Sequence, residues 1–124
     1  MAIRKHSTGT RTLTAATDSF EFTQVHGKVV CIAIKPSGVA TDFRITTTKA
    51  GITEYIFGTA AVVSVAAVGV IHYPKVLAQD LDGVDLATTG NLYKDIVLNG
   101  DSVTIAVAAG TTSETWVVDM YVEE

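Results

Sequence analysis

Few side chains in this sequence have the type and spacing that chemistry at a site requires. Asp80, Asp82 and Asp85 surround Gly83 in the segment DLDGVD, and carboxylates around a glycine turn can supply oxygen ligands to Ca²⁺. The order differs from that of an EF-hand loop, where glycine follows the third acidic position and a distal glutamate completes the site. Because Asp and Gly are also common turn residues, we interpret the segment as a turn and expect no metal site.

The single cysteine and the three histidines give no support to catalysis or zinc binding. Cys31 lies between apolar residues without a basic sequence neighbour that would stabilise a thiolate, so we expect it to pack as a small hydrophobic residue. His6, His26 and His72 are not joined by any spacing typical of zinc ligands. No glycine-rich loop precedes a predicted helix, as phosphate binding would require. We therefore expect no enzyme and no cofactor.

Composition and charge limit the classes of protein further. A length of 124 residues fits one domain, and 48% hydrophobic with 18% charged residues excludes a disordered chain. The net charge of −4 argues against a nucleic-acid partner. The charge is uneven, because residues 1–75 carry eight basic and four acidic side chains, whereas residues 76–124 carry one basic and nine acidic side chains.

Two segments of the chain bear on its domain organisation and on whether it crosses a membrane. Residues 1–11, MAIRKHSTGTR, are basic and polar, and we interpret them as a flexible arm that precedes a single domain over residues 12–124. Residues 55–74 carry no formal charge over about the length of a membrane helix. Polar residues and glycines dilute the hydrophobicity of this segment, and neither flank has a basic cluster. We expect no membrane span.

Alternation of polar and apolar residues dominates the chain and predicts strands. The expected strands cover residues 19–25, 29–34, 42–48, 53–57, 68–79, 93–98, 101–107 and 114–122. Turn residues at 26–28 and at Asn99-Gly100 favour strand reversals, the second as a tight hairpin. Residues 58–67 fit a loop, a strand or a short helix equally well, and residues 80–90 read as a polar loop. Short strands joined by Gly, Asn and Ser turns predict an all-β fold, an antiparallel sandwich or barrel.

The carboxyl-terminal half carries a resemblance to a known group of proteins. It contains VIHYPKV, an Asp-rich turn, and the ending LYKDIVLNGDSVTIAVAAGTTSETWVVDMYVEE. Residues 68–124 thereby resemble small β-sandwich virion proteins of tailed bacteriophages, in particular capsid decoration (cement) proteins. The resemblance implies a jelly-roll-like antiparallel β-sandwich, a homotrimer, a place on the capsid surface, and the major capsid protein as partner.

Two groups of residues would serve such a role. The apolar stretch 60–70 is a candidate subunit interface, with ordinary core as the alternative, and its candidate contact residues are Val62, Val63, Val65 and Val68. The basic side chains of Arg4, Lys5 and Arg11 would reach an acidic capsid surface. A receptor- or carbohydrate-binding module of a tail or fibre is the alternative function, and tyrosines that line an exposed groove would favour it.

Overall fold

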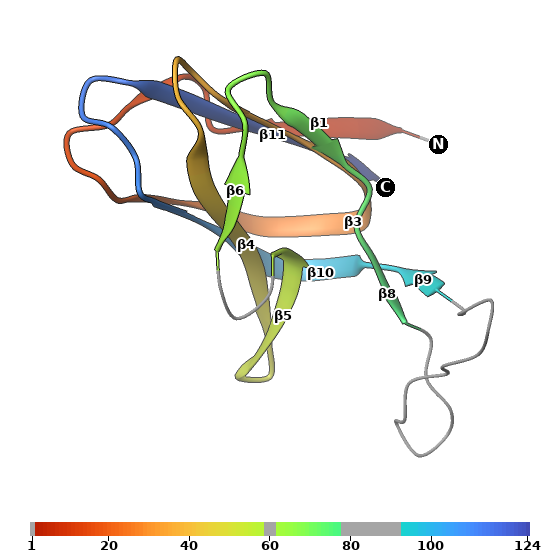
Figure 1. Cartoon of the computed structure of the whole chain (residues 1–124). Coiled ribbons are helices and arrows are strands. Elements are labelled where there is room, and N and C mark those ends of the chain that lie inside the picture. Colours follow the sequence, from red (N-terminus) through yellow and green to blue (C-terminus); the bar gives the residue numbers. More distant parts are fainter. Residues whose placement is uncertain (1, 59–61, 78–92) are drawn as a thin grey trace.

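The computed structural model describes residues 2–58, 62–77 and 93–124, and every regular element in these ranges is a β-strand (Figure 1). The strands are β1 (Ile3–Ser7), β2 (Arg11–Thr12), β3 (Asp18–Pro36), β4 (Thr41–Lys49), β5 (Ile52–Phe57), β6 (Val63–Val65), β7 (Val70–His72), β8 (Lys75–Leu77), β9 (Tyr93–Asp95), β10 (Val97–Ala108) and β11 (Thr115–Glu123). This confirms the all-β fold class. The predicted loop at 80–90, with Asp80, Asp82 and Asp85, lies outside the described residues.

All strand pairs are antiparallel. Nine strands form one sheet in the order β1-β11-β3-β10-β4-β5, to which β2 adds beside β11, β6 beside β4 and β7 beside β3. Strands β8 and β9 form a separate two-stranded sheet. No helix among the described residues is long and apolar enough to cross a membrane.

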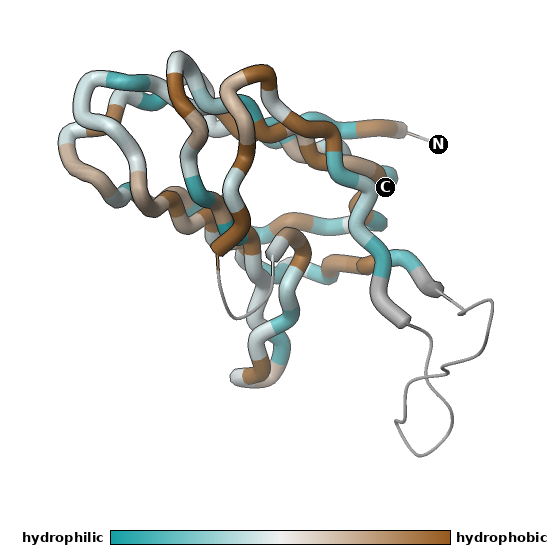
Figure 2. Tube along the Cα trace, in the orientation of Figure 1, coloured by the Kyte–Doolittle hydropathy of each residue, from teal (hydrophilic) through white to brown (hydrophobic). Residues whose placement is uncertain are grey.

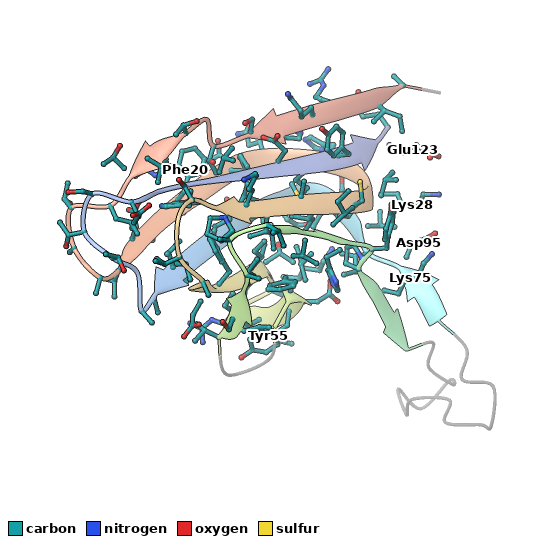
Figure 3. The ribbon with its side chains drawn as sticks, turned by 45° about the horizontal axis from the view of Figure 1, so that its top comes forward. Phe20, Lys28, Tyr55, Lys75, Asp95 and Glu123 are labelled. Atoms are coloured by element: carbon teal, nitrogen blue, oxygen red, sulfur yellow. The ribbon has the colours of Figure 1, made fainter. Side chains whose placement is uncertain are left out.

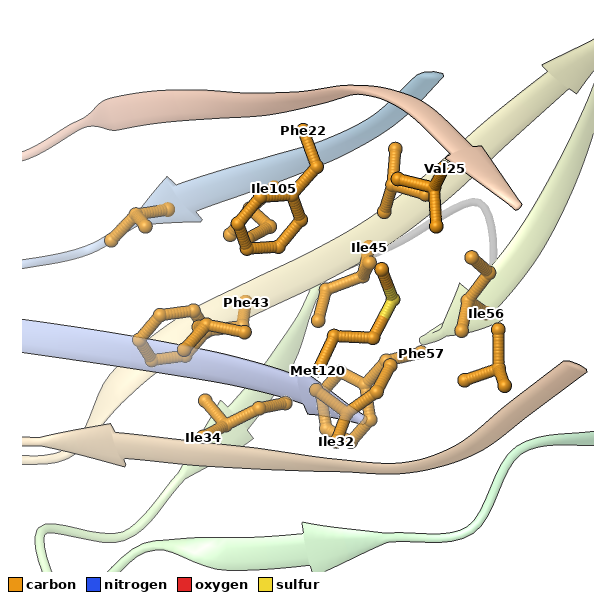
Figure 4. Packing of buried hydrophobic residues seen from close by; sticks show 14 of the residues in the cluster. Phe22, Val25, Ile32, Ile34, Phe43, Ile45, Ile56, Phe57, Ile105 and Met120 are labelled. Carbon is orange, nitrogen blue, oxygen red and sulfur yellow. The ribbon is translucent and has the colours of Figure 1, made fainter. Parts of the chain in front are cut away.

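The long strand β3 joins two parts of the sheet, because its halves have different partners. Residues 18–28 pair with β10, whereas residues 28–36 pair with β11. Apolar side chains from both parts meet in a single core (Figure 4). The ring centroids of Phe43 on β4 and Trp116 on β11 lie 5.8 Å apart across it, with an edge-to-face angle of 68°. This arrangement is compatible with the predicted sandwich, and its jelly-roll connectivity stays a prediction.

Alternation along the expected strand at 114–122 predicts that Trp116, Val118, Met120 and Val122 share one face, and the structure confirms this prediction. Trp116, Val118, Met120 and Val122 on β11 are all buried, as the period of two requires. The segment left open between 58 and 67 contains the short strand β6. The expected strand at 68–79 is interrupted, since Pro74 lies between β7 and β8.

Two predicted strand reversals are wrong. Gly27 and Gly100 both have positive φ, 121° and 77°, but each lies inside a strand that continues past it. The pairing of β10 with β3 shifts register between Asn99 and Asp101 and again between Asp101 and Val103. At Gly100 the positive φ that suits a hairpin is used in a β-bulge, which bends a strand without reversing it, whereas Gly27 keeps its regular pairing with Leu98.

The prediction of a flexible arm is also wrong. Residues 3–7 form β1, which pairs with β11 from Ile3 opposite Glu123 to Ser7 opposite Asp119. The segment buries few side chains, but its backbone supplies hydrogen-bonding partners to the edge of β11. The absence of apolar side chains in residues 4–11 therefore says little about whether this backbone is ordered.

Candidate functional site

The four predicted contact valines fall into different environments. Val65 on β6 belongs to the core at 3% exposure, and Val62 is half-buried. Val63 is 39% exposed, and Val68, in the turn between β6 and β7, is 86% exposed. Within the described residues 62–70, Val65 therefore fits the core alternative, whereas Val63 and Val68 are exposed and stay candidates for a subunit interface. Among the four, Val68 is the side chain most available to a partner.

Exposed apolar side chains continue from Val68 along β7. Val70, Ile71 and Tyr73 are 40%, 60% and 64% exposed, and we call these four residues the β7 strip. Figure 2 shows that the connection from β6 to β7 is largely apolar. Residues 33–35 and 68–71 line a hollow of about 320 Å³ beside the strip. Reasoning from the sequence included Val70 in the candidate stretch 60–70 without naming it as a contact residue, and it missed Ile71; both lie in a strand of only three residues at a sheet edge.

The three predicted basic contact residues differ in whether their charges are paired with a carboxylate. Arg4 on β1 forms an exposed ion pair with Glu124, with 3.3 Å between Nε and Oε1. Lys5 is exposed and forms no ion pair with any described residue. Arg11 is held within the fold, because its Nε and Nη2 donate to the two carboxylate oxygens of Asp18 at 3.2 and 3.3 Å. Of the three, Lys5 alone presents a charge with no described counter-ion.

A second hollow, of about 240 Å³, lies at the end of the molecule where β3 bends. We call it the Lys28 groove; its lining residues are Lys28, Val29, Val30, Tyr73, Lys75, Asp95 and Glu123. Figure 3 shows its four charged side chains close together at that end. They come from β3, β8, β9 and β11, so only the folded chain brings them together.

Charge pairing organises the Lys28 groove. Lys75 Nζ donates to Asp95 Oδ1 at 2.5 Å across the β8–β9 pair. Lys28 Nζ lies between two carboxylates, 3.7 Å from Asp95 Oδ2 and 3.7 Å from Glu123 Oε1. The hydrogen bond from Lys75 holds the pKa of Asp95 below its ordinary value against the opposing effect of burial, and the charges of Lys75 and Lys28 act in the same direction as the hydrogen bond.

The bend at Gly27 places Lys28 in the groove. A Cβ atom at Gly27 would lie 2.5 Å from the backbone oxygen of Glu123, so only glycine lets β3 and the end of β11 approach this closely. The amide of Val29 then donates to the carbonyl of Ile96 at 2.9 Å, which fixes the start of β10 beside the bend.

Two of the residues considered for catalysis or metal binding, His72 and Cys31, pack within the fold. His72 Nε2 lies 3.1 Å from the carbonyl oxygen of Ile56, and its ring packs edge-on against Phe57 with centroids 5.0 Å apart. Cys31 is partly buried on β3. Within residues 2–58, 62–77 and 93–124, no group of three or more His, Cys, Asp or Glu side chains could hold a metal ion.

Comparison with known proteins identifies no relative of this chain. No family model, no curated protein and no solved structure matches it. The fold defines the chain as an antiparallel all-β protein, and the two hollows, with the surfaces around them, are its candidate interaction sites.

Proposed function

We propose that this chain is a non-enzymatic structural protein of a tailed-bacteriophage virion, a decoration protein that binds the major capsid protein and stabilises the head shell. The proposal rests on the resemblance of residues 68–124 and on one structural observation, the exposed β7 strip. A decoration protein acts by bridging neighbouring subunits, so it needs a rigid scaffold with surfaces that bind protein.

The β7 strip has the properties of a protein-binding surface. Four large exposed apolar side chains within residues 68–73, on and beside an edge strand, are more than the scattered exposed apolar residues of an ordinary surface. Strand β7 pairs with β3, and its other edge has no strand partner among the described residues. Such an edge can add a strand from another chain, with apolar side chains supplying the buried area.

We assign the β7 strip to contacts between copies of this chain, with Val68 and Ile71 at the centre. In a homotrimer, each copy would contribute the same strip, and the symmetric repetition would multiply weak contacts. The exposed Lys5 on β1 is then available for the acidic surface of the capsid.

Light scattering over a series of protein concentrations tests this assignment. We expect a species of about three chains for the wild type, whose thermal stability rises with concentration. Ile71→Asp should reduce the mass to that of one chain, because a carboxylate would be desolvated in the interface. Ile52→Asp is the matched control, since Ile52 is 71% exposed on β5, away from the strip.

Two results would count against the proposal. A wild-type protein that stays monomeric at all concentrations would remove self-association through the β7 strip. Failure to co-sediment with shells assembled from the major capsid protein of the same phage would remove the decoration role itself.

A further inference from the structure

We propose that the Lys28 groove binds a neutral saccharide unit. The inference does not rest on the capsid role, because it concerns a separate hollow lined by charged side chains; Tyr73 alone belongs both to this groove and to the β7 strip. Its ligand class follows from the shape of the groove, its balance of charge and the exposed aromatic side chain at its rim.

The size of the groove suits one sugar ring. Its volume of about 240 Å³ lies below the range of roughly 300–1,000 Å³ typical of pockets that enclose drug-sized ligands. Tyr73 lines it and is 64% exposed, so much of its side chain is accessible to a ligand. An aromatic face packs against the C–H face of a sugar, and the phenol hydroxyl can bond to the ring substituents.

The charges of the groove favour a neutral, hydroxyl-rich ligand. Lys28 and Lys75 are balanced by Asp95 and Glu123, so the groove is formally neutral and attracts neither an anion nor a cation by net charge. Ammonium groups are donors only and carboxylates acceptors only. A sugar hydroxyl both donates and accepts, and can therefore bond to either kind of group.

The position of Lys28 leaves room for such a hydroxyl. Its Nζ lies 3.7 Å from each of the carboxylates of Asp95 and Glu123, beyond the usual length of an N–H···O hydrogen bond. Polar contacts of this length are commonly bridged by a water molecule or a ligand oxygen. Asp95 is also held by Lys75, so one wall of the groove is oriented before any ligand binds.

Titration of the isotope-labelled full chain with methyl glycosides, followed by amide NMR shifts, tests the inference. The probes are the methyl glycosides of glucose, galactose, mannose and N-acetylglucosamine, with glucuronate and glucosamine as charged comparisons. We expect at least one neutral glycoside to shift the amides of Val29, Val30 and Tyr73, with a dissociation constant on the order of 1 mM for a single ring. Binding of the charged sugars alone, or no shift at these amides, would overturn it.

Tyrosine variants test whether the sugar stacks on the ring of Tyr73, as distinct from an effect of losing any exposed tyrosine. Tyr73→Ala should weaken binding by about tenfold, whereas Tyr73→Phe should retain most of it because the ring remains. Tyr55→Ala is the matched control, since Tyr55 is exposed on β5, outside the groove. Equal losses in Tyr73→Ala and Tyr55→Ala would contradict the site. The oligomeric mass of each variant, measured in parallel, distinguishes failure of this inference from failure of self-association at the β7 strip.

Discussion

The indole Nε1 of Trp116 donates a hydrogen bond to carboxylate Oδ2 of Asp18 over 3.1 Å. Trp116 is only 1% exposed, so this bond gives the single polar atom of its ring a partner inside the fold. Arg11 donates to both oxygens of the same carboxylate, and its guanidinium lies 5.1 Å from the ring centre of Phe20. The carboxylate of Asp18 thereby links β2, the start of β3 and the start of β11.

The Asp18 carboxylate should make stability dependent on pH. Burial raises its pKa, but the hydrogen bonds from Arg11, the Ser19 amide and Trp116 together outweigh this effect and hold the pKa below the ordinary value of 3.8. A carboxyl whose pKa is depressed by folding stabilises the protein above its unfolded pKa, and this contribution is lost as the pH falls through the folded pKa. Asp18→Asn should therefore lower the free energy of unfolding by about 1 kcal/mol at pH 7.

Urea unfolding of the wild type and Asp18→Asn between pH 7 and pH 2 measures this effect. The difference between the two proteins should be constant near neutral pH and should shrink below about pH 4. A difference that is independent of pH over the whole range would show that the ionised carboxylate is not what stabilises the bond network.

Gly27→Ala should be much more destabilising than an alanine at another glycine of positive φ. At Gly27 a Cβ atom would lie 2.5 Å from the backbone oxygen of Glu123 and 2.7 Å from a methyl carbon of Val122. At Gly51, with φ of 79°, no atom lies within 4 Å of the added carbon. We expect Gly51→Ala to cost about 1 kcal/mol from backbone strain alone, and Gly27→Ala to cost at least about 2 kcal/mol more. Equal melting temperatures for the two variants would contradict the close packing of β3 on β11.

Removal of residues 1–7 should destabilise the domain and promote association. These residues include β1, which pairs with β11 over five positions. Their loss would expose a long unpaired edge of a core strand, a surface that favours aggregation. We expect a lower melting temperature and larger particles in light scattering. An unchanged melting temperature would show that residues 3–7 contribute little to the fold.

The proposed capsid contact of Lys5 needs a change that leaves β1 in place. Lys5→Glu reverses the charge of an exposed side chain without altering its backbone pairing with Tyr121. We expect the melting temperature to change little, because exposed charges contribute little to stability. Binding to capsid shells should weaken, and should become less sensitive to salt. Retention of full binding would remove Lys5 from the contact surface.

Phe43→Ala should be among the most destabilising single substitutions. The side chain is fully buried, and its ring packs edge-to-face on Trp116 between the two parts of the sheet. Truncation of a buried phenylalanine costs about 3–5 kcal/mol through lost burial and the cavity left behind. Phe20→Ala offers a comparison at a partly buried ring, for which a smaller loss in urea unfolding is expected. A similar loss for both would indicate that the core collapses around position 43.

The buried face of β11 could be predicted from the sequence because alternation is a local property. Apolar residues occupy every second position of this strand, at Trp116, Val118, Met120 and Val122. Because side chains two residues apart in a strand point to the same face, this pattern predicts one buried face. The bulge at Gly100 was mistaken for a hairpin, because Asn-Gly permits positive φ in both structures. Only the partner strand decides between them, and here residues on both sides of Gly100 pair with the same strand, β3.

By itself, the sequence determined the all-β class and the buried face of the last strand, since both depend on periodicity along the chain. The tertiary structure decided the pairing of β1 with β11 and the assembly of the Lys28 groove. Lys28, Asp95 and Glu123 lie far apart in sequence and share no local pattern. They meet because β3 bends at Gly27 and exchanges one partner strand for another, which is a consequence of long-range backbone pairing and not of any short motif.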